Sequence, residues 1–175
     1  MPTLAMPTLA LLILLLAACA RPADETIAPA QTAAPEQAAR LWTAATRTVL
    51  GADSARALER QCSRVSPGPV EAYWTPGDAQ LAQMEPALLL LLSQRLEAAG
   101  ESAAPGDYYR QYAGLMIAGR RVIYVNGVHR SAIAGPPFDW RRQAAQICDG
   151  GAITFGVEYD TTTRQFSNFA FNGAI

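Results

Sequence analysis

The sequence predicts an α+β domain, with N-terminal helices packed on an antiparallel sheet of about five or six strands. Three observations lead to this prediction. Apolar residues before residue 100 recur at helical spacing, residues 107–130 alternate like two strands folded back on each other, and residues 153–171 continue that alternation. Helices that precede the strands, rather than alternate with them, are typical of the α+β class. The chain has 175 residues, half of them hydrophobic, which suits one globular domain.

The first helix is expected to begin near residue 36 and to run to about residue 49, because its apolar residues share one helical face. After a break at Gly51, Asp53 can cap a second helix over residues 54–62. A turn cluster, SPGP, then precedes a short strand expected at residues 70–74. These elements should cover one face of the sheet.

A longer helix is expected from Thr75 toward Gly100. Thr75 can be its N-cap, with Pro76 in the first helical position, and Gly100 is a natural C-terminal residue. Pro86 lies inside and should kink the helix or divide it. The run 88–92 is apolar all round, which favours a helix buried on most sides. Its main apolar face would comprise Leu81, Met84, Leu88, Leu92 and Leu96.

The stretch 107–130 predicts a long hairpin that turns at Ala118-Gly119. Both of its faces are largely apolar, as expected for inner strands with helices on one side and partial cover on the other. Gly114 and Gly127 are candidates for bulges or for a close backbone approach. The hairpin should therefore form the middle of the sheet.

The C-terminal part of the chain predicts the remaining strands. A brief strand is expected at residues 146–148, and a half-buried strand at 153–159, with Asp160 as a turn former before the last strand. Glu158 would lie on the polar face of its strand. Its expected partner is Arg110 or Arg121, across the sheet.

The N-terminus carries a motif for export. Residues 9–16 are continuously apolar, too short to span a bilayer as a permanent helix but suited to a signal-peptide core. They end in Leu16-Ala17-Ala18-Cys19, which resembles the lipobox of bacterial lipoproteins. The resemblance implies a signal peptide at 1–18, acylation of Cys19 and a membrane anchor, while alanine at position 20 implies the outer membrane. An ordinary cleaved signal peptide is the alternative.

Residues 19–35, rich in alanine and proline, would form a tether to a domain spanning 36–175. If Cys19 is lipidated as the lipobox resemblance implies, Cys62 and Cys148 remain as a pair in an oxidising periplasm, where disulfides persist. No CxxC spacing occurs, and the single histidine cannot complete a zinc site with them. We therefore expect a disulfide, no metal and no cofactor.

Several short stretches of the last seventy residues resemble a set of uncharacterised small envelope proteins of Gram-negative bacteria. These are Tyr124-Val125-Asn126-Gly127, Cys148-Asp149-Gly150-Gly151, Gly156-Val157-Glu158-Tyr159-Asp160 and Phe171-Asn172-Gly173. The resemblance implies a fold and a location in the cell envelope. It brings no activity with it.

Catalytic signals are weak. His129 could act as a general base with Ser131 or a carboxylate, but no nucleophile signature accompanies it, and we predict no catalytic residue. All fourteen basic residues are arginine, interleaved with fifteen acids to a net charge of −1, which argues against nucleic acid as a partner.

The remaining functional hypothesis is a binding surface on the sheet. A face left open by the helices would have the aromatic and arginine composition of binding hot spots; burial in the core is the alternative for the same residues. The first hypothesis is thus a non-enzymatic, lipid-anchored periplasmic protein that binds another envelope component. The second is a small-ligand carrier with a pocket between sheet and leucine-rich helix, and the third is a small hydrolase. The candidate surface residues are Tyr108, Arg110, Tyr112, Tyr124, Glu158 and Tyr159.

Overall fold

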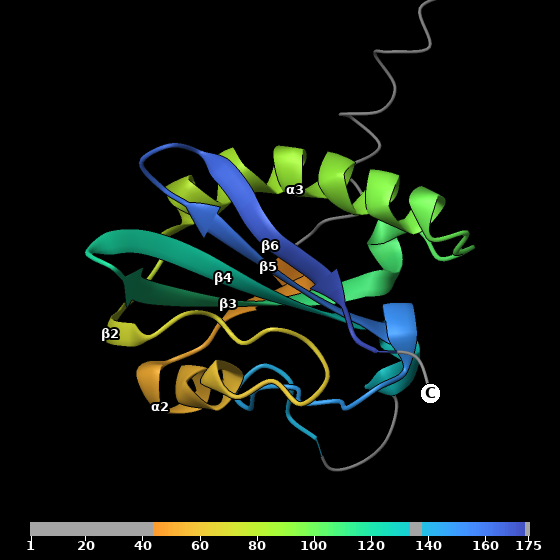
Figure 1. Cartoon of the computed structure of the whole chain (residues 1–175), viewed down its shortest axis with the longest axis horizontal. Helices are drawn as coiled ribbons and strands as arrows, with labels where there is room; N and C mark the ends of the chain where they lie inside the picture. The colour runs from red at the N-terminus through yellow and green to blue at the C-terminus, as the bar shows by residue number, and fades with distance from the viewer. Residues whose placement is uncertain (1–43, 134–137, 174–175) are drawn as a thin grey trace, which may run out of the picture. The chain divides into compact units, whose positions relative to one another are not determined.

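The computed structural model describes residues 44–133 and 138–173. In this part of the chain two α-helices and six strands form an α+β fold (Figure 1). The helices are α2 (Ala52–Ala55) and α3 (Asp78–Ala98). Five short 3-10 turns join or extend these elements: η1 (Ala44–Thr46), η2 (Arg56–Glu59), η3 (Pro105–Asp107), η4 (Arg130–Ala132) and η5 (Gly151–Ile153). The strands are β1 (Arg47–Val49), β2 (Val70–Trp74), β3 (Tyr108–Ile117), β4 (Arg120–His129), β5 (Thr154–Asp160) and β6 (Gln165–Phe171).

The strands form one sheet in the order β1-β3-β4-β5-β6, with β2 also paired to β3. The β3–β4 hairpin lies at its centre and pairs along ten residues of each strand, as the sequence predicts. Its two-residue turn has Ala118 at φ 48° and Gly119 at φ 71°, the left-handed values that tight hairpins need. Because β1 runs parallel to β3, the sheet is mixed rather than wholly antiparallel.

Helix α3 crosses one face of the sheet (Figure 1). Its five expected apolar residues are all buried against the tyrosines, valines and phenylalanines of that face. Leu90, however, is 60% exposed, so the apolar run is not buried all round. The helix continues through Pro86, which lies on the solvent side, where water can satisfy the carbonyl left without a partner one turn earlier.

The opposite face is covered by α2, η2 and chain without regular structure. Leu58 of η2 is completely buried there, against Ala113, Leu115 and Val122 of the hairpin. Residues 139–149, which we call the strap, lie over the same face and contain no helix or strand. The expected strand at 146–148 is therefore wrong, and both faces of the sheet are covered in the described part of the chain.

Three boundaries in the first half differ from the sequence prediction. Residues 47–49 form a strand rather than the end of a helix, because their backbone pairs in parallel with residues 110–112, and tertiary pairing overrides a weak helical pattern. The expected helix at 54–62 is replaced by the two short turns α2 and η2. Helix α3 begins after Gly77 instead of Thr75. The expected start of the first helix, before residue 44, lies outside the described residues.

The glycines of the hairpin are places of close approach, as expected. A Cβ atom on Gly127 would lie 1.9 Å from the Phe155 ring, and one on Gly114 would lie 2.1 Å from the carbonyl oxygen of Trp74. Strand β5 is buried at all seven positions rather than on one face only. Burial on both sides explains why Glu158 does not lie on an open polar face.

Candidate functional site

The six residues predicted as a binding surface are all buried, with exposed fractions between 0 and 5%. The prediction of an open face is therefore wrong for these side chains, and the alternative, burial in the core, is confirmed. The physical reason is that cover exists on both sides of the sheet. Four of the six belong to the α3 face and two to the strap face: Tyr108, Arg110, Tyr112 and Tyr159 on the first, Tyr124 and Glu158 on the second.

On the α3 face, the buried charges meet at Glu85. Its Oε1 accepts a hydrogen bond from the Tyr112 hydroxyl at 2.7 Å and lies 3.5 Å from a nitrogen of the fully buried Arg110. Its Oε2 accepts from Arg47 at 2.9 Å, and Arg47 also reaches the exposed Asp78. Strand β1, strand β3 and helix α3 are thereby joined by one carboxylate. The sequence pattern does not indicate this role for Glu85, since a single acidic residue in an apolar helix is expected to face the solvent.

Three buried tyrosines of the sheet, Tyr108, Tyr112 and Tyr124, have raised pKa values. Burial raises the pKa of Tyr108 to about 12, helped by the nearby carboxylates of Glu101 and Asp107. Burial likewise raises the pKa of Tyr112 and of Tyr124, although an arginine beside each opposes the shift. The Tyr108 and Tyr112 hydroxyls donate hydrogen bonds, to the Ala152 carbonyl and to Glu85, whereas the Tyr124 hydroxyl accepts one from Arg64.

On the strap face, Arg64 lies across the sheet. Its guanidinium donates to the Tyr124 hydroxyl at 3.2 Å and to the Thr154 hydroxyl at 3.3 Å. It also donates to the side-chain oxygens of Asn126 and Asn172. The group fits because position 156 is a glycine, where a Cβ would lie 2.5 Å from Arg64 Nε. We call these five side chains the Arg64 cluster: Arg64, Tyr124, Asn126, Thr154 and Asn172.

The strap is fixed by amide side chains of the hairpin. Gln111 Nε2 donates to the carbonyls of Trp140 and Gln143, each at 2.6 Å, while its Oε1 accepts from the backbone of Ala145 at 2.8 Å. Asn126 adds a bond to the Ala145 carbonyl. Backbone without regular structure needs such partners when it is buried. Polar residues at inward positions of apolar strands were the sequence signal for this role, and the prediction did not use it.

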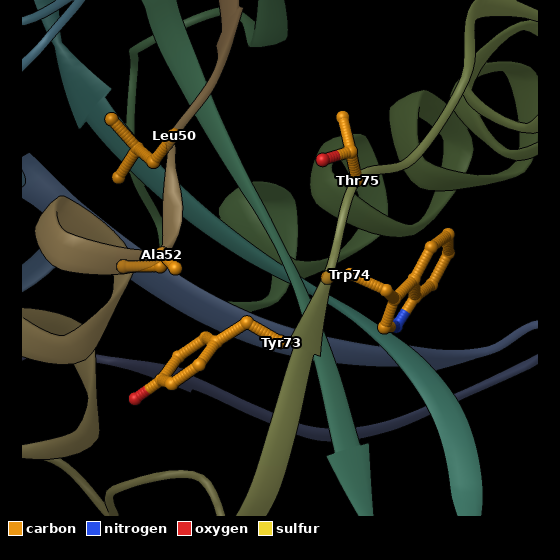
Figure 2. Close-up of a pocket in the computed structure, with 7 residues that line it drawn as sticks. Leu50, Ala52, Tyr73, Trp74 and Thr75 are labelled. Atoms are coloured by element: carbon orange, nitrogen blue, oxygen red, sulfur yellow. The ribbon is translucent and has the colours of Figure 1, made fainter.

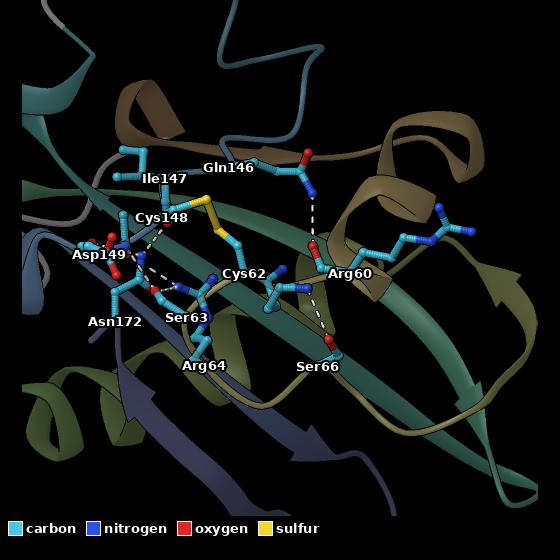
Figure 3. Close-up of a disulfide and its surroundings, with 12 residues drawn as sticks. Arg60, Cys62, Ser63, Arg64, Ser66, Gln146, Ile147, Cys148, Asp149 and Asn172 are labelled. Carbon is cyan, nitrogen blue, oxygen red and sulfur yellow. Dashed lines mark hydrogen bonds between the residues drawn. A yellow bond between two sulfur atoms is a disulfide. The ribbon is translucent and has the colours of Figure 1, made fainter. Parts of the chain in front are cut away.

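The structure confirms the disulfide between Cys62 and Cys148, with Cα atoms 5.3 Å apart, and Cys148 belongs to the strap. Figure 3 shows it between the loop before β2 and the strap, next to Asn172. The Asn172 carboxamide donates to the carbonyls of Ile147 and Asp149 while its oxygen accepts from Arg64. Asn172 thus links the two chain segments that the disulfide also links.

Glu158 is buried beside Tyr124, its neighbour across the β4–β5 pair. The two expected partners are wrong, because Arg110 and Arg121 project from the other face of the sheet, toward Glu85 and over the Trp74 ring respectively. Among the described residues, no hydrogen bond or ion pair joins the Glu158 carboxylate. Burial is the main reason that the pKa of Tyr124 is raised, and the nearby Glu158 carboxylate adds to the rise.

His129 has a local structural role. Its Nδ1 lies 2.8 Å from the Ser131 hydroxyl and accepts from the Ser131 backbone, so it caps the short turn η4. Within residues 44–133 and 138–173, no group of histidine, cysteine and acidic side chains could hold a metal ion. No helix of the described chain is both long and apolar enough to cross a membrane. Cys19, the predicted lipidation site, lies outside the described residues.

A small pocket opens where β1 and β2 end beside each other on β3. Figure 2 shows Leu50 and Ala52 on one side of it, with Trp74 and Thr75 on the other. Its volume is about 80 Å³. Typical small-molecule sites measure about 300–1,000 Å³, so this pocket is too small for a drug-sized ligand. It also lies away from the interface between the sheet and the α3 leucines, where the sequence hypothesis put a ligand pocket.

Comparison of the chain with protein-family models, with curated proteins and with solved structures finds no match. A function is therefore argued from the residues and their arrangement alone.

Proposed function

We propose that this chain is a lipid-anchored protein of the bacterial cell envelope, facing the periplasm from the outer membrane. Its folded part binds another envelope protein and performs no catalysis. The proposal has two separable parts, the location and the binding.

The observation that carries the location is the Cys62–Cys148 disulfide. Disulfides persist in oxidising compartments such as the periplasm and are rare in the cytosol. This bond uses two of the three cysteines, so the third is Cys19, within Leu16-Ala17-Ala18-Cys19. A lipid on Cys19 and a disulfide in the domain fit the same compartment, and the two features support each other.

For the binding, the sheet edge at β6 is a better candidate than the buried faces. β6 ends the strand order, so its outer backbone groups have no strand partner in the described chain. Its seven residues, QFSNFAF, include no charge and no proline, the usual means by which edge strands avoid pairing. Such an edge can accept an extended segment of another protein as an added strand. Asn168, at φ 55°, bends β6 in the middle, so a docked segment would pair with one half of it.

Photo-crosslinking in cells that make the full chain tests the binding. A crosslinkable residue at the exposed Gln165 on β6 should give a discrete adduct with an envelope protein, and the change Ser167→Lys should abolish it. A matched probe at Gln94, exposed on α3, should give none. Equal adducts from both positions, or an adduct that survives Ser167→Lys, would place the binding elsewhere.

A further inference from the structure

The two cysteines of the disulfide are both exposed to solvent. The bond joins the loop that contains Cys62 to the strap, and neither segment has regular secondary structure at that point. A thiol from outside can therefore approach both residues of the bond without the apolar core having to open. This accessibility distinguishes the bond from a disulfide buried in a core.

Each of the two segments is also attached to the sheet by bonds of its own. On the loop side, Arg64 belongs to the Arg64 cluster, and the Ser63 carbonyl accepts from the backbone of Gly173 at 3.2 Å. On the strap side, Asn126 Nδ2 of β4 donates to the Ala145 carbonyl at 2.9 Å. Gln146 Nε2 also donates to the carbonyls of Ala57 at 2.5 Å and Arg60 at 3.0 Å, in η2 and just before Cys62. These contacts remain when the sulfur–sulfur bond is broken.

The Asn172 side chain connects the loop that contains Cys62 with the strap. It bonds Arg64, two residues after Cys62, and the carbonyls of Ile147 and Asp149, which flank Cys148 (Figure 3). Asn172 is 6% exposed, so water competes weakly for these bonds. Neither cysteine belongs to the two apolar clusters of the core. The two sulfurs are therefore held near each other by the fold as well as by their own bond.

We propose that Cys62 and Cys148 form a thiol–disulfide exchange site, which a dithiol can open and an oxidant can close while the domain stays folded. In the opening reaction a thiolate of the dithiol attacks one cystine sulfur, and a mixed disulfide forms as the other cysteine leaves as a thiolate and takes a proton. The second thiol of the dithiol then attacks the mixed disulfide. The cystine gains two electrons and two protons, and the dithiol becomes a disulfide.

The test uses dithiothreitol as the dithiol, on the purified full chain without denaturant. After iodoacetamide, the intact mass should show two more alkylated cysteines than the protein that was not reduced. Near-ultraviolet circular dichroism should keep the signal of the folded oxidised protein, because the core clusters do not include the cysteines. Removal of dithiothreitol and addition of oxidised glutathione should restore the disulfide without refolding.

The variant Asn172→Ala distinguishes an exchange site from a disulfide that only stabilises the fold. In the oxidised state the variant should keep the near-ultraviolet circular dichroism signal of the wild type. In the reduced state it should re-form the bond at least tenfold more slowly, since one of the links between loop and strap is gone. If Asn172→Ala does not fold, Gln146→Ala removes only exposed strap bonds and should slow closure in the same direction.

Two results would overturn the proposal. One is a bond that dithiothreitol reduces only together with global unfolding, seen as simultaneous loss of the near-ultraviolet circular dichroism signal of the folded protein. The other is closure that is equally fast in wild type, Asn172→Ala and Gln146→Ala. Cys62→Ser combined with Cys148→Ser serves as the permanently open control and should show the circular dichroism signal of the reduced wild type.

Discussion

Replacing Glu85 by glutamine should destabilise the domain far more than replacing Asp78 by asparagine. Both carboxylates lie 2.9 Å from the Arg47 guanidinium, so they make the same ion pair by distance. They differ in surroundings: the Glu85 side chain is 12% exposed and the Asp78 side chain 92%. Only Glu85 also faces Arg110, whose side chain is completely buried.

The magnitude follows from that burial. Removing one member of a buried ion pair costs about 3–5 kcal/mol, because the remaining charge stays buried without compensation. Glutamine keeps the size of Glu85 and can still accept the Tyr112 hydrogen bond, so the change isolates the charge. With some solvent at Glu85 we expect about 3 kcal/mol, which is roughly 10 °C in melting temperature for a domain of this size. An exposed pair contributes about 0–1 kcal/mol, and this is the expectation for Asp78→Asn.

Urea unfolding followed by tryptophan fluorescence measures both variants at neutral pH. Adding Arg110→Met to Glu85→Gln removes the buried charge that faced Glu85 and should restore part of the loss. Similar losses for Glu85→Gln and Asp78→Asn, or no recovery in the double variant, would refute the account of a buried charge centre at Glu85.

Three further predictions concern the core and its titrating groups. In a denaturant series, Leu88→Ala should lower the free energy of unfolding by about 2–5 kcal/mol, whereas the matched change Leu90→Ala at an exposed position should lower it by less than about 0.5 kcal/mol. Equal losses would mean that α3 packs by another face. The pKa values of Tyr108, Tyr112 and Tyr124 are raised in the folded protein, so their contribution to the free energy of unfolding is fully present below the ordinary tyrosine pKa near 10. The free energy of unfolding should fall as the pH rises above that value. Absorbance at 295 nm should show that these tyrosines ionise only as the protein unfolds. The Asp160 pKa is lowered, first by the Thr163 backbone donor, so its contribution is present above the ordinary pKa near 4 and is lost as the pH falls below it. Asp160→Asn should therefore weaken the domain at pH 7 and flatten its acid unfolding curve, and an unchanged curve would contradict this role.

The elements that the sequence predicts well are those whose pattern is local. The hairpin and its turn follow from alternation around Ala118-Gly119, and the buried face of α3 follows from its helical spacing. Asp160 acts as the expected turn former, its carboxylate accepting from the backbone of Thr162 and Thr163. Each of these features depends on residues close in the chain.

The features that could not be predicted depend on distant pairing. Residues 47–49 become a strand because β3, sixty residues later, has an open edge beside them. The burial of Tyr124 and Glu158 depends on whether the strap covers the second face of the sheet. That cover is organised by Gln111, Asn126 and Asn172 through contacts between distant parts of the chain. The sequence around Arg64 does not indicate its role, since its guanidinium fits on the sheet only because Gly156, distant in the chain, has no side chain there.

The most direct test of the proposed location is the intact mass of the full-length protein extracted from the envelope of a bacterium that makes it. The account predicts a mature chain beginning at Cys19 and carrying the mass of a diacylglyceryl group and an amide-linked acyl chain. Cys19→Ala should release the protein from the membrane fraction. A mature chain that begins elsewhere or has no acyl mass, or fractionation that Cys19→Ala leaves unchanged, would contradict the central claim that this is a lipid-anchored envelope protein.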